Sequence, residues 1–144
     1  AFHVSKNLNR LYNKGHFELR INGDFEGTMR GCAARDDTWI SEEIIASYGK
    51  LNEMGYGFSF ETWRNEKLVG GLYGVALGRV FFGESMFHTE TDASKIALLF
   101  LVEFLQENNF QLLDTQYIND HLVQFGAIEI PNEEYEELLA RALE

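Results

Sequence analysis

The fold is decided by residues 57–83, which read GFSFETWRNEKLVGGLYGVALGRVFFG. Residues 57–63 are typical of a strand, residues 65–67 of a turn, and residues 68–76 and 79–83 of two further strands. Gly70, Gly71 and Gly74 lie inside the second strand, where glycine often marks a bulge or a close backbone approach. The stretch therefore predicts a three-stranded meander.

Helices are predicted on both sides of this meander. Residues 93–108 form a helix capped by Thr91 or Asp92, and residues 96–102 are apolar all round, as in a helix buried against a sheet. Ser41 begins another helix that runs to about residue 54. The remaining predicted elements are helices over 4–12, 25–34, 119–125 and from Pro131 to 143, and strands over 17–21 and 110–118. This order favours a mixed α+β sheet domain flanked by helices over a regular βαβ repeat.

The composition is that of a globular domain with a substantial core. The chain has 144 residues, 45% apolar and 14% aromatic, and one proline. A single cysteine, Cys32, excludes an internal disulfide and a Cys-rich zinc site, and we expect it to be a buried small residue. The longest apolar run has seven residues, whereas a membrane-spanning helix needs about 20. We expect a soluble, cytoplasmic protein without a signal peptide.

The charge is strongly acidic but unevenly distributed. The net charge is −11, which repels nucleic acid unless basic residues are segregated. Residues 1–35 hold six basic and three acidic side chains, a balance of +3, so the rest of the chain carries −14. This basic segment fits either contact with phosphate or a solvated helix face.

The strongest chemical signal is a carboxylate and an amide two positions apart. On a strand, Asp114 and Gln116 point to one face, together with Phe110, Leu112 and Ile118. Polar side chains in an apolar row destabilise the fold unless they are hydrogen-bonded or belong to a functional site. The pair can hold an attacking amine and accept its proton, or it can be a strand-end polar pair satisfied by the backbone.

A second signal is Glu84, which ends a strongly apolar strand beside Gly83. A carboxylate there suits the binding of a cationic side chain of a substrate. The alternative is a structural ion pair with Arg79 or Lys95.

Weaker candidates have two interpretations each. His121 is either a base or a residue that caps a helix or is simply exposed. Trp39, in a predicted loop, either stacks on a nucleotide base or closes the loop by packing. The four histidines show no metal-ligand spacing. Residues 70–74 lack the pattern of a phosphate-binding loop.

Taken together, these blocks resemble the bacterial leucyl/phenylalanyl-tRNA–protein transferases. The order and spacing agree from about residue 2 to 140. The matching blocks are residues 38–40, 66–75, 82–87, 93–95, 114–116, 119–121, 126–127 and 130–131.

The resemblance implies an acyltransferase-type fold related to acetyl-CoA-dependent N-acetyltransferases. It implies transfer of leucine or phenylalanine from tRNA to proteins that begin with arginine or lysine, which marks them for degradation through the N-degron pathway. No CoA or metal cofactor is implied, because the aminoacyl ester is already activated. The family's N-terminal domain precedes the matching part, so we expect residues 1–144 to be a single catalytic domain, acting as a monomer and without a membrane partner.

The resemblance also assigns roles to residues. Gln116 would contact the attacking α-amino group, Asp114 would orient Gln116 and help take up the proton, and Glu84 would recognise the acceptor's basic side chain. Trp39 would pack against the terminal adenosine of the tRNA, and Asn119 would belong to the substrate-binding positions. The pocket for the leucyl or phenylalanyl side chain would include Phe81, Met86, Leu98, Leu72, Leu101 and Leu105.

Three of these pocket positions differ from the family pattern. Leu72, Leu101 and Leu105 stand where a methionine and two phenylalanines are expected in relatives. Smaller aliphatic walls predict a changed preference among leucine, phenylalanine and methionine as donors.

Two other functions stay open at this stage. An N-acyltransferase that uses another activated donor would bind acyl-CoA and not charged tRNA. A non-catalytic module would capture N-terminal Arg or Lys through Glu84 and form no product with any charged tRNA.

Overall fold

A computed structural model describes residues 15–34, 40–110 and 112–115. In this part of the chain five strands form one sheet in the order β1-β2-β3-β4-β5. Strands β1 to β4 pair antiparallel and β5 pairs parallel with β4. The strands are β1 (Glu18–Ile21), β2 (Gly57–Arg64), β3 (Lys67–Leu77), β4 (Val80–His88) and β5 (Leu112–Thr115). The predicted mixed α+β architecture is confirmed.

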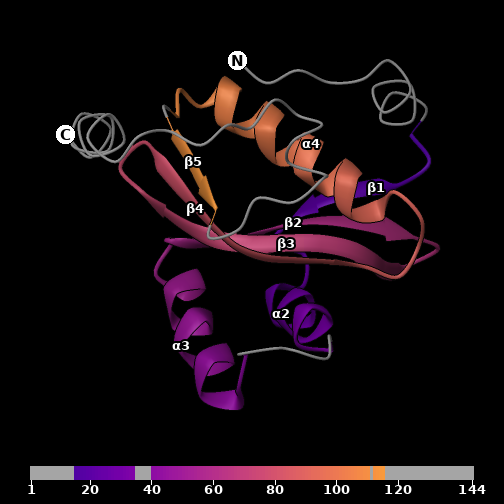
Figure 1. The fold of residues 1–144 in the computed structure, drawn as a ribbon, viewed down its shortest axis with the longest axis horizontal. Helices are drawn as coiled ribbons and strands as arrows, with labels where there is room; N and C mark the ends of the chain where they lie inside the picture. Colours follow the sequence, from indigo (N-terminus) through magenta and orange to yellow (C-terminus); the bar gives the residue numbers. More distant parts are fainter. Residues whose placement is uncertain (1–14, 35–39, 111, 116–144) are drawn as a thin grey trace.

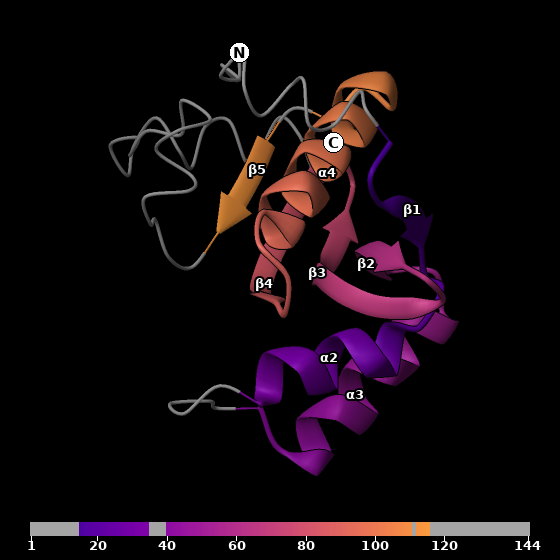
Figure 2. The same ribbon diagram turned by 90° about the vertical axis from the view of Figure 1, so that its right-hand side faces the viewer.

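Three helices cover the two faces of the sheet. Figure 1 shows α4 (Ala93–Glu107) on one face and both α2 (Phe25–Ala33) and α3 (Glu42–Glu53) on the other. Figure 2 shows the same three layers from the side. The predicted helices over 25–34, 42–54 and 93–108 are therefore confirmed to within one or two residues.

Tight turns connect the central strands. Asn65 and Glu66 have φ of 52° and 64°, as a type I′ hairpin turn requires at both central positions. The turn between β3 and β4 contains Gly78, with φ of 58°. The predicted meander is confirmed, although β4 runs five residues beyond the predicted end at Gly83.

Helix α4 connects β4 to β5 and makes their parallel pairing possible, because parallel strands need a crossover connection. Asp92 occupies its N-cap position with φ of 67°, but its side chain accepts no capping hydrogen bond. The predicted start of the helix is confirmed, because Asp92 is its N-cap residue, but the cap includes no side-chain hydrogen bond. With this left-handed backbone, the Asp92 carboxylate instead lies 3.9 Å from the Lys95 ammonium.

Two glycines make α2 possible at its position. The side chain of the N-cap residue Asp24 accepts a hydrogen bond of 2.9 Å from the Gly27 N–H. A Cβ on Gly31 would stand 2.6 Å from the Phe87 ring on β4. These glycines weaken helix propensity, but Gly27 leaves room for the Asp24 carboxylate, which a Cβ would approach to 2.2 Å, and Gly31 allows α2 to lie directly on the sheet.

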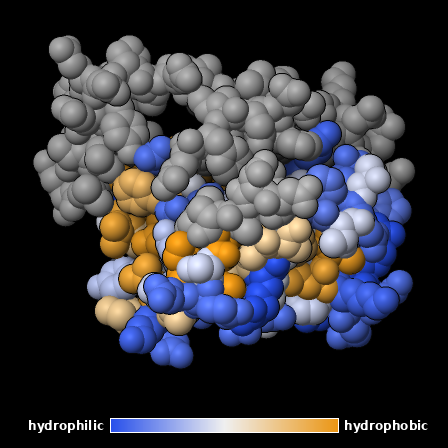
Figure 3. Space-filling model, turned by 60° about the horizontal axis from the view of Figure 1, so that its bottom comes forward, coloured by the Kyte–Doolittle hydropathy of each residue, from blue (hydrophilic) through white to orange (hydrophobic). Residues whose placement is uncertain are grey.

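Each face of the sheet has its own hydrophobic cluster. Apolar side chains also form patches on the surface (Figure 3). In the α4 cluster, Phe60 makes T-shaped ring contacts with Phe81, Phe100 and Phe104. The buried members of the α4 cluster are Phe60, Leu72, Phe81, Met86, Ile96, Ala97, Leu98, Leu99, Leu101 and Leu105. Those of the α2–α3 cluster are Phe25, Met29, Cys32, Ile40, Ile45, Tyr73 and Phe87. Cys32 is 1% exposed, which confirms it as a buried small residue.

Several predicted elements lie outside the described residues. These are the helices over 4–12, 119–125 and 131–143, and the part of the predicted strand 110–118 beyond residue 115.

Candidate active site

The pairing of β4 with β5 defines the candidate site. Phe82 stands opposite Asp114, and Gly83 opposite Thr115. Leu113 packs against the α4 cluster, so the alternation of a strand places Asp114 on the opposite face. The negative charge of Asp114 acts on Glu84, two residues beyond Phe82. The structure thus brings together the two acids that the sequence singles out.

A β-bulge positions Glu84. Tyr73 on β3 pairs with Ser85 while Gly74 pairs with Gly83, so Glu84 is the extra residue of the ladder. A bulge commonly turns a side chain toward a site. A Cβ on Gly74 would lie 2.2 Å from the Phe82 carbonyl oxygen. The expected bulge or close approach in this strand is confirmed at Gly74.

The Glu84 side chain is partly buried. Burial raises its pKa above the usual value, and the charge of Asp114 raises it further, whereas a hydrogen bond from the Tyr48 hydroxyl lowers it. Burial and the nearby Glu84 carboxylate also raise the pKa of Tyr48. Lys95, one predicted ion-pair partner of Glu84, lies beside Asp92, and Arg79, the other, is exposed.

Tyr48 was not predicted as a site residue. It lies on the inner face of α3 with Ile44 and Ile45 and packs against the α2–α3 cluster. A tyrosine on an apolar helix face normally needs a partner for its hydroxyl group, and that need was the available signal. Its partner on β4 is distant in the sequence, so local pattern could not supply it.

One prediction about the face of Asp114 is wrong. Phe110 precedes β5, its N–H bonds the Leu105 carbonyl oxygen at 3.0 Å, and its ring lies 6.2 Å from that of Phe104 on α4. Phe110 therefore packs on the α4 side. The reason is that strand alternation begins only at Leu112, where β5 begins.

The six predicted pocket residues lie in one hydrophobic cluster. Those six residues all belong to the α4 cluster, and each is at most 8% exposed: Phe81, Met86, Leu98, Leu72, Leu101 and Leu105. Trp39, Gln116, Asn119 and His121 lie outside the described residues.

Part of the basic N-terminal segment is already paired with acids. Arg20 forms ion pairs with Glu18 and Glu66, and Arg30 with Glu26 and Glu42. These exposed pairs reduce the positive charge that either arginine offers to phosphate. The other four basic residues of the segment lie outside the described residues: Lys6, Arg10, Lys14 and Arg35.

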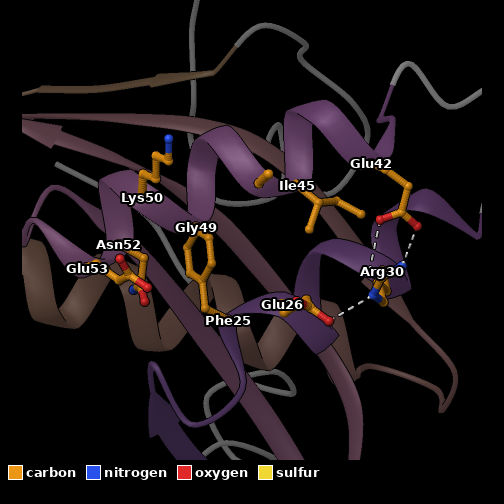
Figure 4. A pocket seen from close by; sticks show the side chains of 10 residues that line it. Phe25, Glu26, Arg30, Glu42, Ile45, Gly49, Lys50, Asn52 and Glu53 are labelled. Atoms are coloured by element: carbon orange, nitrogen blue, oxygen red, sulfur yellow. Dashed lines mark hydrogen bonds and ion pairs between the residues drawn. The ribbon is translucent and has the colours of Figure 1, made fainter.

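A separate groove of about 460 Å³ lies between α2 and α3 (Figure 4). Arg30 bridges its two sides by donating hydrogen bonds of 2.9 and 3.1 Å to Glu42. The lining residues are Phe25, Glu26, Arg30, Glu42, Ile45, Ala46, Gly49, Lys50, Asn52 and Glu53. Neither Glu84 nor Asp114 is among them.

The described residues provide neither a metal-binding cluster nor a membrane-spanning helix. In residues 15–34, 40–110 and 112–115, no group of three or more His, Cys, Asp or Glu side chains is placed to hold a metal ion. Within the same ranges, no helix has the length and apolar character needed to cross a membrane.

Solved acetyltransferases share this fold. An aminoglycoside acetyltransferase from an uncultured soil metagenomic sample superposes with a TM-score of 0.57 and 14% identity, covering 90% of this chain and 88% of that one. The aminoglycoside N-acetyltransferase AAC(6')-Iy gives a TM-score of 0.53 at 12% identity, covering 89% of this chain and 86% of that one. The fold is thus of the N-acetyltransferase-like acyltransferase type, as predicted.

Sequence comparison identifies the family. A family model described as leucyl/phenylalanyl-tRNA protein transferase matches residues 1–140. Proteins with that name from Akkermansia muciniphila and Gloeobacter violaceus are 52% and 54% identical to this chain. The alignments cover 99% and 98% of this chain, and 76% and 73% of those proteins. The chain therefore belongs to the leucyl/phenylalanyl-tRNA–protein transferase family.

Proposed function

We propose that this protein transfers leucine or phenylalanine from aminoacyl-tRNA to the N-terminus of cytoplasmic proteins that begin with arginine or lysine. The observation that carries the proposal is the meeting of Glu84 and Asp114 at the junction of β4 and β5. The Glu84 carboxylate binds the acceptor's cationic side chain, and the Asp114 carboxylate takes up the proton of the reacting amine. Residues 1–144 act as one catalytic domain and as a monomer.

The reaction is the aminolysis of an ester. The acceptor's α-amino nitrogen attacks the ester carbonyl carbon, a C–N amide bond forms, and the C–O bond to the terminal ribose breaks. The amine loses a proton and the ribose hydroxyl gains one. Gln116 holds the amine, and Asp114 orients Gln116 and takes up the proton. Positioning lowers the barrier by several kcal/mol, and proton transfer adds about 10²–10⁴-fold.

The donor's side chain is placed against the α4 cluster. Phe81 and Met86 come from β4, the strand that carries Glu84, and Leu98, Leu101 and Leu105 come from α4, so the cluster shares β4 with the site but lies on the face of the sheet opposite Asp114. Trp39 packs against the terminal adenosine, and Asn119 contributes to substrate binding. Leu72 on β3 completes the aliphatic wall.

Transfer itself is tested by mixing the protein with tRNA charged with leucine or phenylalanine and a peptide that begins with arginine. Mass spectrometry is expected to show the addition of one leucyl or phenylalanyl residue. A peptide that begins with alanine is the control and should remain unmodified. A product formed from acyl-CoA but not from charged tRNA would overturn the proposal.

Replacing Glu84 by glutamine tests the acceptor site. A charge-assisted hydrogen bond contributes about 1.5–3 kcal/mol, so KM for the arginine peptide should rise about 10- to 100-fold with kcat less affected. Because burial and Asp114 raise the pKa of Glu84, its ionised form is lost on acidification at a higher pH than for an exposed glutamate. In the wild type, 1/KM should therefore fall with decreasing pH, and in Glu84→Gln this fall should be absent. Equal KM values in both proteins would contradict the assignment.

A further inference from the structure

Phe60 on β2 extends the row of predicted pocket residues across the sheet. It pairs with Leu72 on β3, and Leu72 pairs with Met86 on β4. Directly opposed residues of antiparallel strands project from the same face, with Cβ atoms about 5 Å apart. All three side chains belong to the α4 cluster. The row therefore crosses three strands on the α4 face, and its β3 and β4 members are predicted to line the donor pocket.

Other aromatic rings fix the Phe60 ring in place. Phe60 is 0% exposed, and its ring centroid lies 5.7 Å from that of Phe81, with an interplanar angle of 82°. On α4 it contacts the rings of Phe100 at 5.6 Å and Phe104 at 5.1 Å, both edge-on. Edge-to-face pairs at these distances are favourable. Because protein interiors are close-packed, the Phe60 ring cannot move aside without displacing these neighbours.

The position of β2 in the sheet makes Phe60 the far end of this row. The strands follow one another in the order β2-β3-β4-β5, with Glu84 on β4 and Asp114 on β5. Neighbouring strands lie about 4.8 Å apart, so β2 is roughly 10 Å from β4. A donor side chain that enters the α4 cluster from the β4 side thus meets Met86 first, then Leu72, and Phe60 last.

We propose that Phe60 is a specificity-determining residue, whose ring closes the far end of the donor pocket and favours the leucyl over the longer phenylalanyl side chain. The aliphatic walls at Leu72, Leu101 and Leu105 leave space along the sides of the pocket. Phe60 instead limits its length. This inference rests on the proposed function, because it assumes that the donor's side chain enters the α4 cluster. The cross-strand row and the ring contacts support it independently of any activity.

Phe60→Leu removes the ring and keeps the side chain apolar. One methylene group more or less in an apolar pocket changes the discrimination between substrates about 10- to 200-fold. The ratio of kcat/KM for phenylalanyl-tRNA to kcat/KM for leucyl-tRNA, measured with the arginine peptide, should therefore rise about 10-fold. A purely structural role would lower both values together and leave their ratio unchanged.

The matched control is Phe25→Leu, the same substitution at a ring that is 7% exposed in the α2–α3 cluster, on the other face of the sheet. This variant should keep the wild-type ratio. Phe60→Met also removes the ring but leaves a flexible apolar side chain. It should raise the ratio as well, and it takes the place of Phe60→Leu should that protein fail to fold. An unchanged or lowered ratio in a folded Phe60 variant would overturn the inference.

A binding measurement separates this inference from the proposed function. Adenosine that carries leucine or phenylalanine through a 3′-amide bond lacks the reactive ester, so calorimetry gives its Kd without an acceptor peptide. In Phe60→Leu, the Kd of the phenylalanyl analogue relative to that of the leucyl analogue should fall about 10-fold. An unchanged Kd ratio, or no binding of either analogue by the wild type, would overturn the inference. A shifted Kd ratio together with no transfer by the wild type would reject the proposed function but leave the role of Phe60 standing.

Discussion

Asp114→Ala is expected to lower the rate of transfer about 10²–10⁴-fold, the usual contribution of a group that manages a proton. Asp114 is partly buried on β5, opposite Phe82 of β4. Its neighbour Leu113 packs into the α4 cluster and should keep β5 in place after the substitution. The effect should therefore appear in kcat, measured in single-turnover reactions with charged tRNA and the arginine peptide.

Asp114→Ala should also change the pKa of Glu84. The charge of Asp114 raises the pKa of Glu84, so removing it lowers that pKa. Peptide binding by Asp114→Ala should therefore persist to lower pH than in the wild type, although transfer is lost. Glu107→Ala, in the exposed last turn of α4, is the control and should behave as the wild type. Full transfer by a folded Asp114→Ala protein would remove Asp114 from the mechanism.

Elements dominated by local signals could be predicted from the sequence. Ser41 accepts a hydrogen bond from the Ile44 N–H at 3.3 Å, as expected of a hydroxyl cap at the start of α3. The apolar run 96–102 lies in α4 and is buried against the sheet, as its lack of a polar face indicates. The β2–β3 hairpin follows from its two-residue turn at Asn65 and Glu66.

Features that depend on distant residues could not be predicted. The parallel pairing of β5 with β4 is set by the α4 crossover, and the bulge at Glu84 by the pairing of β3 with β4. Two of the predicted site residues, Glu84 and Asp114, could be chosen by their chemistry, since each is an acid in an apolar strand. Their proximity arises from the packing of the folded chain alone.

Glu61 is the clearest example of a residue whose environment depends on distant residues, because nothing in the neighbouring sequence indicates that this acid inside β2 is buried. It is 0% exposed. Oε2 accepts hydrogen bonds from the Asp24 N–H at 2.9 Å, from the Thr28 hydroxyl at 3.2 Å and from the Ser59 hydroxyl at 2.6 Å. Oε1 accepts one from the Trp63 indole N–H at 2.8 Å. The Glu61 carboxylate thus links the start of α2 to the sheet through hydrogen bonds.

Replacing Glu61 by alanine should destabilise the protein by about 3–5 kcal/mol, because four donors lose a buried acceptor at once. The melting temperature should fall by roughly 10 °C, and the urea midpoint should fall with little change in m. Glu61→Gln keeps the shape but turns an amide N–H₂ toward donors, so it should fall between alanine and wild type. Glu107→Ala, with an exposed side chain, should leave the midpoint unchanged. Should Glu61→Ala unfold at the wild-type urea concentration, the carboxylate would not be what holds α2 to β2, and the packing of Gly31 on Phe87 would have to suffice.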